Sequence, residues 1–135
     1  MARTMQCVVW QGRGKVEIEE RPVPEPGLGE VLVKILTNGI CSSDFPIVQG
    51  KVEGSFPGMV LGHEPVGRVV STNAGRLVVG QRVALDTMLA CGKCRFCHEG
   101  HPEWCVDSKE IGFSVDGCYS AYAVFPEANL HILPV

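Results

Sequence analysis

The chain has 135 residues, with 12 Lys and Arg against 15 Asp and Glu, a net charge of −3 and no block of like charge. A chain of this length forms one domain and buries about two thirds of its unfolded surface, so its core does not depend on a metal alone. The charge balance argues against nucleic acid as a partner, and no apolar run approaches the roughly 20 residues of a membrane span.

The first predicted element is a β-hairpin. Residues 5–10 and 15–20 are short β-type runs, the second alternating apolar and charged residues, and the turn Gly12-Arg13-Gly14 separates them. The next segment, 21–29, has three prolines at alternate positions, which neither a strand ladder nor a helix tolerates. We therefore expect this segment to be an extended connector.

A largely buried strand is predicted from Glu30 to Asn38. Two valines and an isoleucine at alternate positions share one face, and two leucines lie on the other face. The dipeptide Asn38-Gly39 ends the strand and places Cys41 at its tip.

A short helix is expected to begin at Ser43, because Ser42 can cap it and Pro46 falls within its first turn. The glycine-bounded segment 50–58 is then predicted to be a mobile surface loop.

A glycine-flanked turn follows and carries His63 and Glu64. The pattern predicts a strand from Val66 to Ser71 after this turn, and another turn at residues 73–75. Residues 77–86 predict a further pair of strands, broken at the glycine in their middle.

The segment 91–105 contains four of the seven cysteines, spaced C-x2-C-x2-C-x7-C. Each C-x2 step, helped by nearby glycines, turns the backbone tightly enough to aim successive sulfurs at one point, and the longer loop returns the last sulfur. We interpret the segment as a closed zinc site whose ligands are Cys91, Cys94, Cys97 and Cys105. Four thiolates saturate the metal, so the predicted role is structural.

Three other interpretations of these cysteines fit the sequence less well. A disulfide knot requires an oxidising compartment, yet residues 1–30 contain no apolar signal-peptide core and seven cysteines is an odd number. The bacterial ferredoxin run has its fourth cysteine after three residues and then a proline, whereas here the gap is seven and Val106 follows. Four free thiols would repel one another once ionised. Zinc is favoured, and the cysteines predict a reducing, cytoplasmic location.

Two strands, 117–125 and 129–133, are predicted after the cysteine loop. The 16 glycines and nine prolines interrupt the sequence too often for long helices. Seven or so short strands therefore predict an all-β fold with short helices, arranged as an antiparallel barrel or sandwich.

A second group of reactive residues is centred on Cys41 and His63. Each alone is more often a buried structural residue than a ligand. Their context is more specific, because the motifs I-C-S-S-D, G-H-E-P-V-G-R-V-V, G-Q-R-V, the cysteine loop and D-G-C-Y-S-A-Y-A-V-F-P follow in this order. Over nearly its whole length the chain resembles the N-terminal catalytic domain of zinc-dependent medium-chain alcohol and polyol dehydrogenases. That domain is a GroES-like, partly open β-barrel with a protruding structural zinc loop.

The resemblance implies roles for individual residues. Cys41 and His63 would bind a catalytic zinc, with Glu64 close behind it, and the four-cysteine loop would hold the structural zinc. Ser43 would pass on the proton of the alcohol, and Asp44 would hydrogen-bond a ligand imidazole. Helix capping is the alternative role for Ser43 and Asp44.

The resemblance also implies a reaction and its cofactors. Zinc would lower the pKa of a small alcohol or polyol, and a hydride would pass to NAD or NADP. The family's third zinc ligand lies beyond Val135, and the two G-x-G runs here lack the third glycine of a dinucleotide site. We therefore expect residues 1–135 to be the catalytic domain without a Rossmann domain, inactive alone, with one tightly held zinc and the catalytic site weakly filled or empty.

Other functions remain open on the sequence alone. The chain could be a stand-alone zinc-binding barrel that acts as an interaction or regulatory module. The zinc-free quinone reductase branch of the same fold needs no cysteine loop, which counts against it. The resemblance leaves homo-oligomerisation open. Phe45, Phe56 and Trp104 are candidate pocket linings, and Trp104 could equally shield the zinc loop.

Overall fold

The computed structural model describes residues 3–134 of the chain, which consist mainly of strands. The strands are β1 (Thr4–Gly12), β2 (Lys15–Pro22), β3 (Glu30–Asn38), β4 (Met59–Val60), β5 (Pro65–Thr72), β6 (Arg82–Leu85), β7 (Met88–Leu89), β8 (Lys109–Glu110), β9 (Tyr122–Pro126) and β10 (Leu130–Ile132). The helices are short: α1 (Asp44–Val48), α2 (Arg95–His98) and the 3-10 turns η1 (Pro102–Trp104) and η2 (Glu127–Asn129). Within the described residues, no helix is long and apolar enough to cross a membrane.

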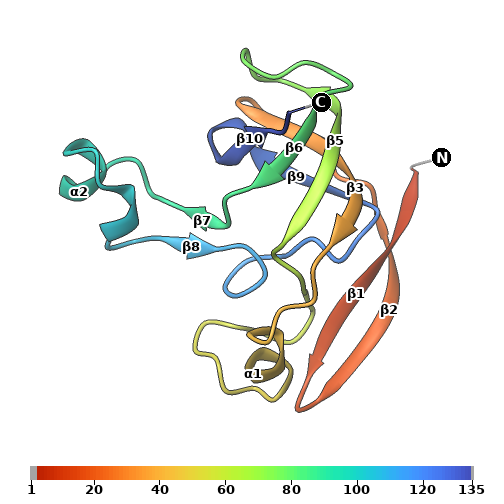
Figure 1. Cartoon of the computed structure of the whole chain (residues 1–135). Helices are drawn as coiled ribbons and strands as arrows, with labels where there is room; N and C mark the ends of the chain where they lie inside the picture. Colours follow the sequence, from red (N-terminus) through yellow and green to blue (C-terminus); the bar gives the residue numbers. More distant parts are fainter. Residues whose placement is uncertain (1–2, 135) are drawn as a thin grey trace.

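The strands form three open antiparallel sheets. The largest has five strands in the order β10-β6-β5-β3-β9, the second has the order β2-β1-β4, and β7 pairs with β8. Figure 1 shows the β1-β2 hairpin along one side of the body, α1 below the five-stranded sheet, and the segment with α2 projecting on the opposite side. The predicted all-β fold, a partly open barrel with a protruding loop, is confirmed.

The main core lies on one face of the five-stranded sheet. Val31 and Val33 of β3 are at most 1% exposed and pack with Val69, Val83 and Phe125 from neighbouring strands. Fully burying such side chains contributes roughly 1.5–3 kcal/mol each. The predicted strand bounds agree with β3. The face of β3 that carries Leu32 and Leu36 is less buried than expected, because Leu36, near the end of the strand, is exposed to solvent.

A second buried cluster fixes α1 to the rest of the body. Trp10 of β1 packs with Ile47, Met59 and Leu61, and its indole Nε1 donates a hydrogen bond to the carbonyl of Val48 at 3.0 Å. This packing determines where the residues at the start of α1 lie. The segment 50–58 contains no helix or strand, in agreement with its predicted loop character, whereas its mobility remains a prediction.

The opening hairpin is confirmed, with Thr4 opposite Pro22 in its register. Its turn requires left-handed backbone at Arg13, with φ of 47°, between two glycines of positive φ. The strand β2 continues through Arg21 and Pro22, so the predicted connector begins two residues too early. Pro22 is tolerated because β2 lies at the edge of its sheet.

The predicted capping of the helix by Ser42 is wrong. The N-cap residue is Ser43, its backbone is already helical, and no side-chain cap hydrogen bond is formed. Main-chain turns occupy this corner instead: the N–H of Asp44 donates to the carbonyl of Cys41 at 3.1 Å, and that of Phe45 to the carbonyl of Ser42 at 3.4 Å.

Two predicted strands are shorter in the structure. The first half of the segment 77–86 is not a strand, because side chains satisfy its N–H groups: Leu77 donates to Glu127 at 2.6 Å and Val78 to Gln81 at 2.9 Å. The predicted strand 117–125 begins only at Tyr122. The N–H groups of its first residues donate instead to carbonyl groups of β4 and of the β4-β5 connection. Partners far away in the sequence thus contribute in both segments: Glu127 binds the first, and residues 60–62 bind the second.

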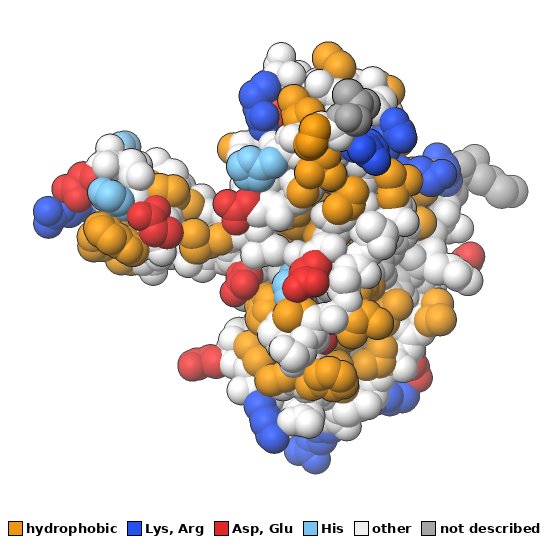
Figure 2. Space-filling view, in the orientation of Figure 1, with side chains coloured by type: hydrophobic (Ala, Val, Ile, Leu, Met, Phe, Trp, Pro, Cys, Tyr) orange, Lys and Arg blue, Asp and Glu red, His pale blue; other side chains and the backbone are white. Residues whose placement is uncertain are grey.

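The cysteine segment forms a lobe, defined here as residues 91–105, at the end of a two-stranded neck. Met88 pairs with Glu110 and Leu89 with Lys109 in this neck. Figure 2 shows the lobe standing clear of the body, with apolar side chains along one of its faces. The lobe therefore has little body surface against which to pack.

Candidate metal centres

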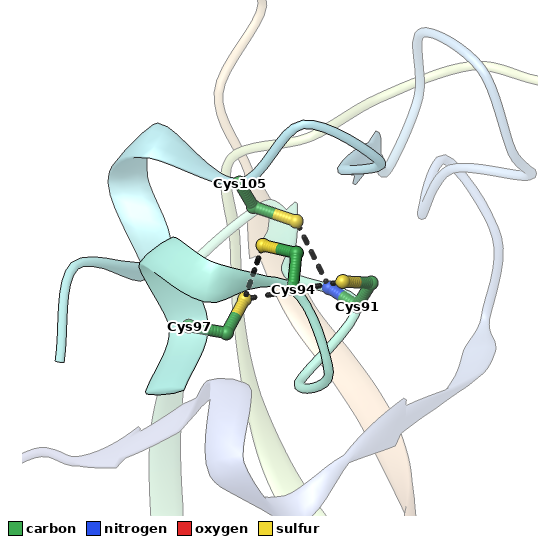
Figure 3. A group of neighbouring side chains, drawn as sticks. All are labelled: Cys91, Cys94, Cys97 and Cys105. Carbon is green, nitrogen blue, oxygen red and sulfur yellow. Dashed lines mark hydrogen bonds between the residues drawn. The ribbon is translucent and has the colours of Figure 1, made fainter. Parts of the chain in front are cut away.

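The four cysteines of the lobe converge on one point (Figure 3). One sulfur from each of Cys91, Cys94, Cys97 and Cys105 lies within 4.8 Å of the others. The Sγ atoms of Cys94 and Cys97 are 3.5 Å apart, and those of Cys91 and Cys97 are 4.0 Å apart. Tetrahedral zinc with Zn–S bonds of about 2.3 Å holds sulfurs about 3.8 Å apart, so the arrangement fits this metal.

The electrostatics of this cluster also fit a cation. Backbone N–H groups of Cys97 and Val106 lower the pKa of Cys94 to about 6. Burial and the neighbouring Cys94 sulfur raise the pKa of Cys97 to about 12. One thiolate thus opposes ionisation of the next, and a divalent cation would allow all of them to ionise. All seven cysteines lie within residues 3–134 and none forms a disulfide, which contradicts the disulfide-knot alternative.

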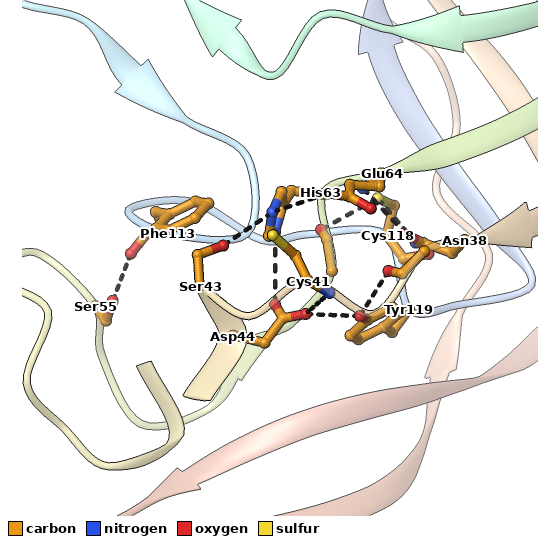
Figure 4. Close-up of polar contacts among 12 residues, drawn as sticks. Asn38, Cys41, Ser43, Asp44, Ser55, His63, Glu64, Phe113, Cys118 and Tyr119 are labelled. Atoms are coloured by element: carbon orange, nitrogen blue, oxygen red, sulfur yellow. Dashed lines mark hydrogen bonds and ion pairs between the residues drawn. The ribbon is translucent and has the colours of Figure 1, made fainter. Parts of the chain in front are cut away.

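A second group of donors lies where β3 ends and β5 begins. Cys41, His63 and Glu64 offer a sulfur, an imidazole nitrogen and a carboxylate oxygen within 4.8 Å of one another (Figure 4). His63 is only 9% exposed, whereas the Glu64 side chain is about half exposed, with its Oε1 4.0 Å from His63 Nε2. These three donor types are all ligands that zinc accepts.

Ser43 and Asp44, also predicted as site residues, lie on either side of the His63 ring. Ser43 Oγ is 3.2 Å from His63 Nε2, and Asp44 Oδ1 is 3.5 Å from His63 Nδ1. Neither Asp44 Oδ1 nor His63 Nδ1 has a hydrogen-bond partner among the described residues, although both atoms are buried. The structure therefore brings Asp44 opposite the imidazole without closing a hydrogen bond. Ser43 makes no side-chain cap, so its capping alternative is contradicted.

The turn that carries Glu64 is held from the end of β3. The Glu64 N–H donates to Asn38 Oδ1 at 3.1 Å, and the Gly39 N–H donates to the Glu64 carbonyl at 3.1 Å. A Cβ at Gly39 would meet the Glu64 carboxylate, so a larger residue at this position would displace that half-exposed side chain. The two ligand-bearing turns are thus joined by one main-chain hydrogen bond and by one to the Asn38 side chain.

Sequence reasoning missed several residues that support this group. Asn38 Nδ2 donates to the Cys118 carbonyl at 2.9 Å, and the Cys118 thiol donates to the Gly62 carbonyl at 3.1 Å. Burial raises the pKa of the Cys118 thiol to about 12, which keeps it a neutral donor. Tyr119 contacts Asp44, as described below, and the Phe113 ring lies 4.7 Å from the His63 ring. The motif D-G-C-Y marked Cys118 and Tyr119, but nothing in it identified their partners.

The predicted pocket linings do not form one wall. Phe45 and Phe56 are 63% and 45% exposed, and Trp104 lies in the lobe, stacked on His101 with ring centroids 4.4 Å apart. A groove of about 380 Å³ lies elsewhere, lined by residues of the β1-β2 hairpin and of β9, and includes no residue of either donor group.

Comparisons with known proteins agree with this geometry. Residues 27–135 match the family model for the alcohol dehydrogenase GroES-like domain. Over 122 residues the chain is 38% identical to L-threonine 3-dehydrogenase of Xanthomonas euvesicatoria pv. vesicatoria (strain 85-10), which covers 87% of this chain and 36% of that relative. The chain thus spans about a third of the length of this curated relative.

Two solved structures share the fold. A protein assigned as a zinc-binding dehydrogenase of Sinorhizobium meliloti 1021, bound to NADP, has a TM-score of 0.90 at 31% identity, over 98% of this chain and 39% of that one. Galactitol-1-phosphate dehydrogenase from Escherichia coli has a TM-score of 0.88 at 31% identity, over 96% of this chain and 38% of that one.

Proposed function

This chain belongs to the alcohol dehydrogenase GroES-like domain family, the catalytic domain of zinc-dependent medium-chain dehydrogenases, and we propose that it is the zinc-binding part of an enzyme that oxidises a small alcohol or polyol with NAD or NADP. The observation that supports this most directly is the convergence of Cys41, His63 and Glu64 beside the Ser43 hydroxyl. The names of the relatives indicate substrates with alcohol groups, L-threonine and galactitol 1-phosphate.

In this proposal Cys41, His63 and Glu64 hold the catalytic zinc. The metal, when bound, supplies Lewis-acid chemistry that lowers the pKa of an alcohol. Ser43 lies on the same side of the imidazole as Glu64, so its hydroxyl can accept the alcohol's proton and pass it on. Phe113 covers another part of the His63 ring and limits the access of water to it.

The lobe has a separate, structural role in the proposal. Its four cysteines leave no position for substrate on the metal that they would hold. We infer that this site fills first and tightly, and that the Cys41 site fills weakly, because Glu64 is half exposed and must be ordered on binding.

The experiment that tests the proposal is a cobalt titration of the zinc-free protein, with Cys41→Ser and Cys94→Ser as matched variants. We expect two metals in the wild type, loss of the weaker one in Cys41→Ser, and loss of the tighter one in Cys94→Ser. The product of the complete gene should then reduce NAD or NADP with small alcohols, and Ser43→Ala should lower kcat/KM by about 10²- to 10⁴-fold. If Cys41→Ser does not change the binding of the second metal, the proposed catalytic site is contradicted, and the chain is then only a zinc-binding module.

A further inference from the structure

We propose that Tyr119 is a positioning residue for the imidazole of His63 and acts through the carboxylate of Asp44. The inference rests on the proposed function, since it takes His63 to be a metal ligand. It concerns a residue to which the fold and the sequence pattern assign no role.

The Asp44 carboxylate lies in a buried site with two hydrogen-bond donors. Asp44 is 6% exposed, and its Oδ2 atom accepts the Cys41 N–H at 3.0 Å and the Tyr119 hydroxyl at 2.8 Å. Two donors on one oxygen fix the rotation of the carboxylate. Its other oxygen, Oδ1, is thereby directed at His63 Nδ1, 3.5 Å away (Figure 4).

Tyr119 is itself held in place by its main chain and by its ring. Its N–H donates to the Leu61 carbonyl at 2.7 Å, and its own carbonyl accepts the Val8 N–H at 2.8 Å. Its ring lies directly against Gly62, where an added Cβ would lie 2.6 Å from the ring. Tyr119 is therefore held by the strand β1 and by the two residues that precede His63.

The Tyr119 hydroxyl lies 2.8 Å from the Gly39 carbonyl as well as from Asp44, so it joins the end of β3 to α1. Of these two acceptors the carboxylate is the stronger. Burial raises the pKa of Tyr119 above its ordinary value, so the phenol keeps its proton for this contact near neutral pH.

These contacts determine which nitrogen of His63 is free. A carboxylate 3.5 Å from Nδ1 favours a proton on that nitrogen, although no hydrogen bond is closed there. In that tautomer the lone pair of Nε2 faces Ser43 and Glu64, as a metal ligand requires. Without the phenol, Asp44 keeps only the Cys41 N–H and can rotate away from the ring. His63 would then populate both tautomers, and the second donor group would bind metal less tightly.

The test compares Tyr119→Phe with Tyr122→Phe, since Tyr122 is the chain's other tyrosine and its hydroxyl contacts Arg3 instead. Cobalt affinity at the Cys41 site should fall about 3- to 10-fold in Tyr119→Phe and stay unchanged in Tyr122→Phe; direct loss of a ligand's outer partner typically costs about 10- to 100-fold. Ring ¹⁵N NMR should show His63 as the Nδ1–H tautomer in the wild type and as a mixture in Tyr119→Phe.

A double-mutant cycle with Asp44→Asn tests the route. If Tyr119 acts through Asp44, adding Tyr119→Phe to Asp44→Asn should change the affinity by less than about 1.5-fold. Wild-type tautomer and affinity in Tyr119→Phe, or additive losses in the cycle, would overturn the proposal. Failure of the wild type to bind a second metal would contradict the proposed function instead, and the His63 tautomer would still decide the role of Tyr119.

Should Tyr119→Phe not fold, 3-fluorotyrosine provides a milder change. Incorporated into the Tyr122→Phe protein, it labels Tyr119 alone and makes its phenol more acidic. A shift of the His63 ring nitrogen resonances supports the proposal, and unchanged resonances contradict it.

Discussion

Glycine residues allow three chain segments to meet beside His63. The Gly62 backbone has a φ of +93° and lies against the Tyr119 ring. A Cβ on Gly112 would lie 2.6 Å from the Gly62 carbonyl oxygen. A Cβ on Gly117 would collide with the same oxygen. The position of His63 therefore depends on small neighbours as much as on its own hydrogen bonds.

Gly62→Ala should lower the free energy of unfolding by about 2–5 kcal/mol, because the left-handed backbone costs about 1–2 kcal/mol and overpacking against Tyr119 adds about 1–3 kcal/mol. Urea unfolding measures the change. Gly14→Ala is the matched control, since Gly14 has a φ of +81° but no atom within 4 Å of an added Cβ. It should lose only the backbone part, about 1–2 kcal/mol. Equal losses in the two variants would contradict the role given to the Tyr119 contact.

At the scale of elements, the Glu127 carboxylate binds the segment before β6 that was predicted to be a strand. Glu127 of η2 accepts the N–H groups of Arg76 and Leu77 at 2.8 and 2.6 Å. The Arg76 guanidinium in turn donates to the Leu130 carbonyl of β10 at 2.8 Å. This contact fixes the loop before β6 to the end of the sheet and occupies two N–H groups that a strand there would use.

Glu127→Gln should reduce the amount of unfolding free energy that the protein loses as the pH falls. The N–H groups of Leu77 and Arg76 lower the pKa of Glu127 below its ordinary value. The ionised Glu127 therefore contributes to the free energy of unfolding above its pKa in the unfolded chain, about 4.3. This contribution is lost as the pH falls through its lower pKa in the folded protein. Urea unfolding from pH 7 to pH 2 should show a smaller acid loss in Glu127→Gln than in the wild type. Glu53→Gln, in the exposed loop, is the control and should keep the wild-type slope.

At the scale of the whole molecule, the body and the lobe are stabilised by different means. The buried apolar clusters include no residue of the segment 91–105, whose four sulfurs converge instead on one point. Figure 1 shows the lobe joined to the body through β7 and β8. The chain's two tryptophans report on the two parts: Trp10 is 4% exposed in the body and Trp104 is 57% exposed in the lobe.

Removing zinc should unfold the lobe and leave the body folded. Structural zinc contributes on the order of 10 kcal/mol to a small metal-dependent fold, and the lobe has little other packing. A strong chelator, or Cys94→Ser, should change the fluorescence of Trp104. The fluorescence of Trp10, measured alone in Trp104→Phe, should not change. Cys7→Ala is the control. This variant should keep the metal, because Cys7 is buried in the body, away from the lobe. Simultaneous loss of both tryptophan signals would show that the lobe and body unfold as one unit.

Zinc content gives a further check at this scale. The purified protein should contain close to one tightly held zinc per chain, with the second site weakly filled or empty, because only the lobe offers four cysteines. Elemental analysis after dialysis measures the ratio. Two tightly held zincs would contradict the inferred difference between the two sites.

Local features were predictable from the sequence alone. The hairpin around Gly12-Arg13-Gly14, the bounds of β3 and the convergence of Cys91–Cys105 all arise from residues close together in the chain. The order of five motifs along the chain also indicated the family. The roles of Cys41, Ser43, Asp44, His63 and Glu64 stay predictions, although the structure brings these residues together.

Only the tertiary structure decided which distant groups support the site. Tyr119 meets Asp44 across 75 residues and Gly39 across 80, and Asn38 meets Cys118 across 80. The same holds for Glu127, which reaches Leu77 across 50 residues and prevents the predicted strand. Periodicity and spacing describe which face of an element is apolar and how a turn bends, but not which buried donor will meet which acceptor. Those pairs form when the sheets pack, because every buried polar group must then find its partner among the groups that packing brings within reach.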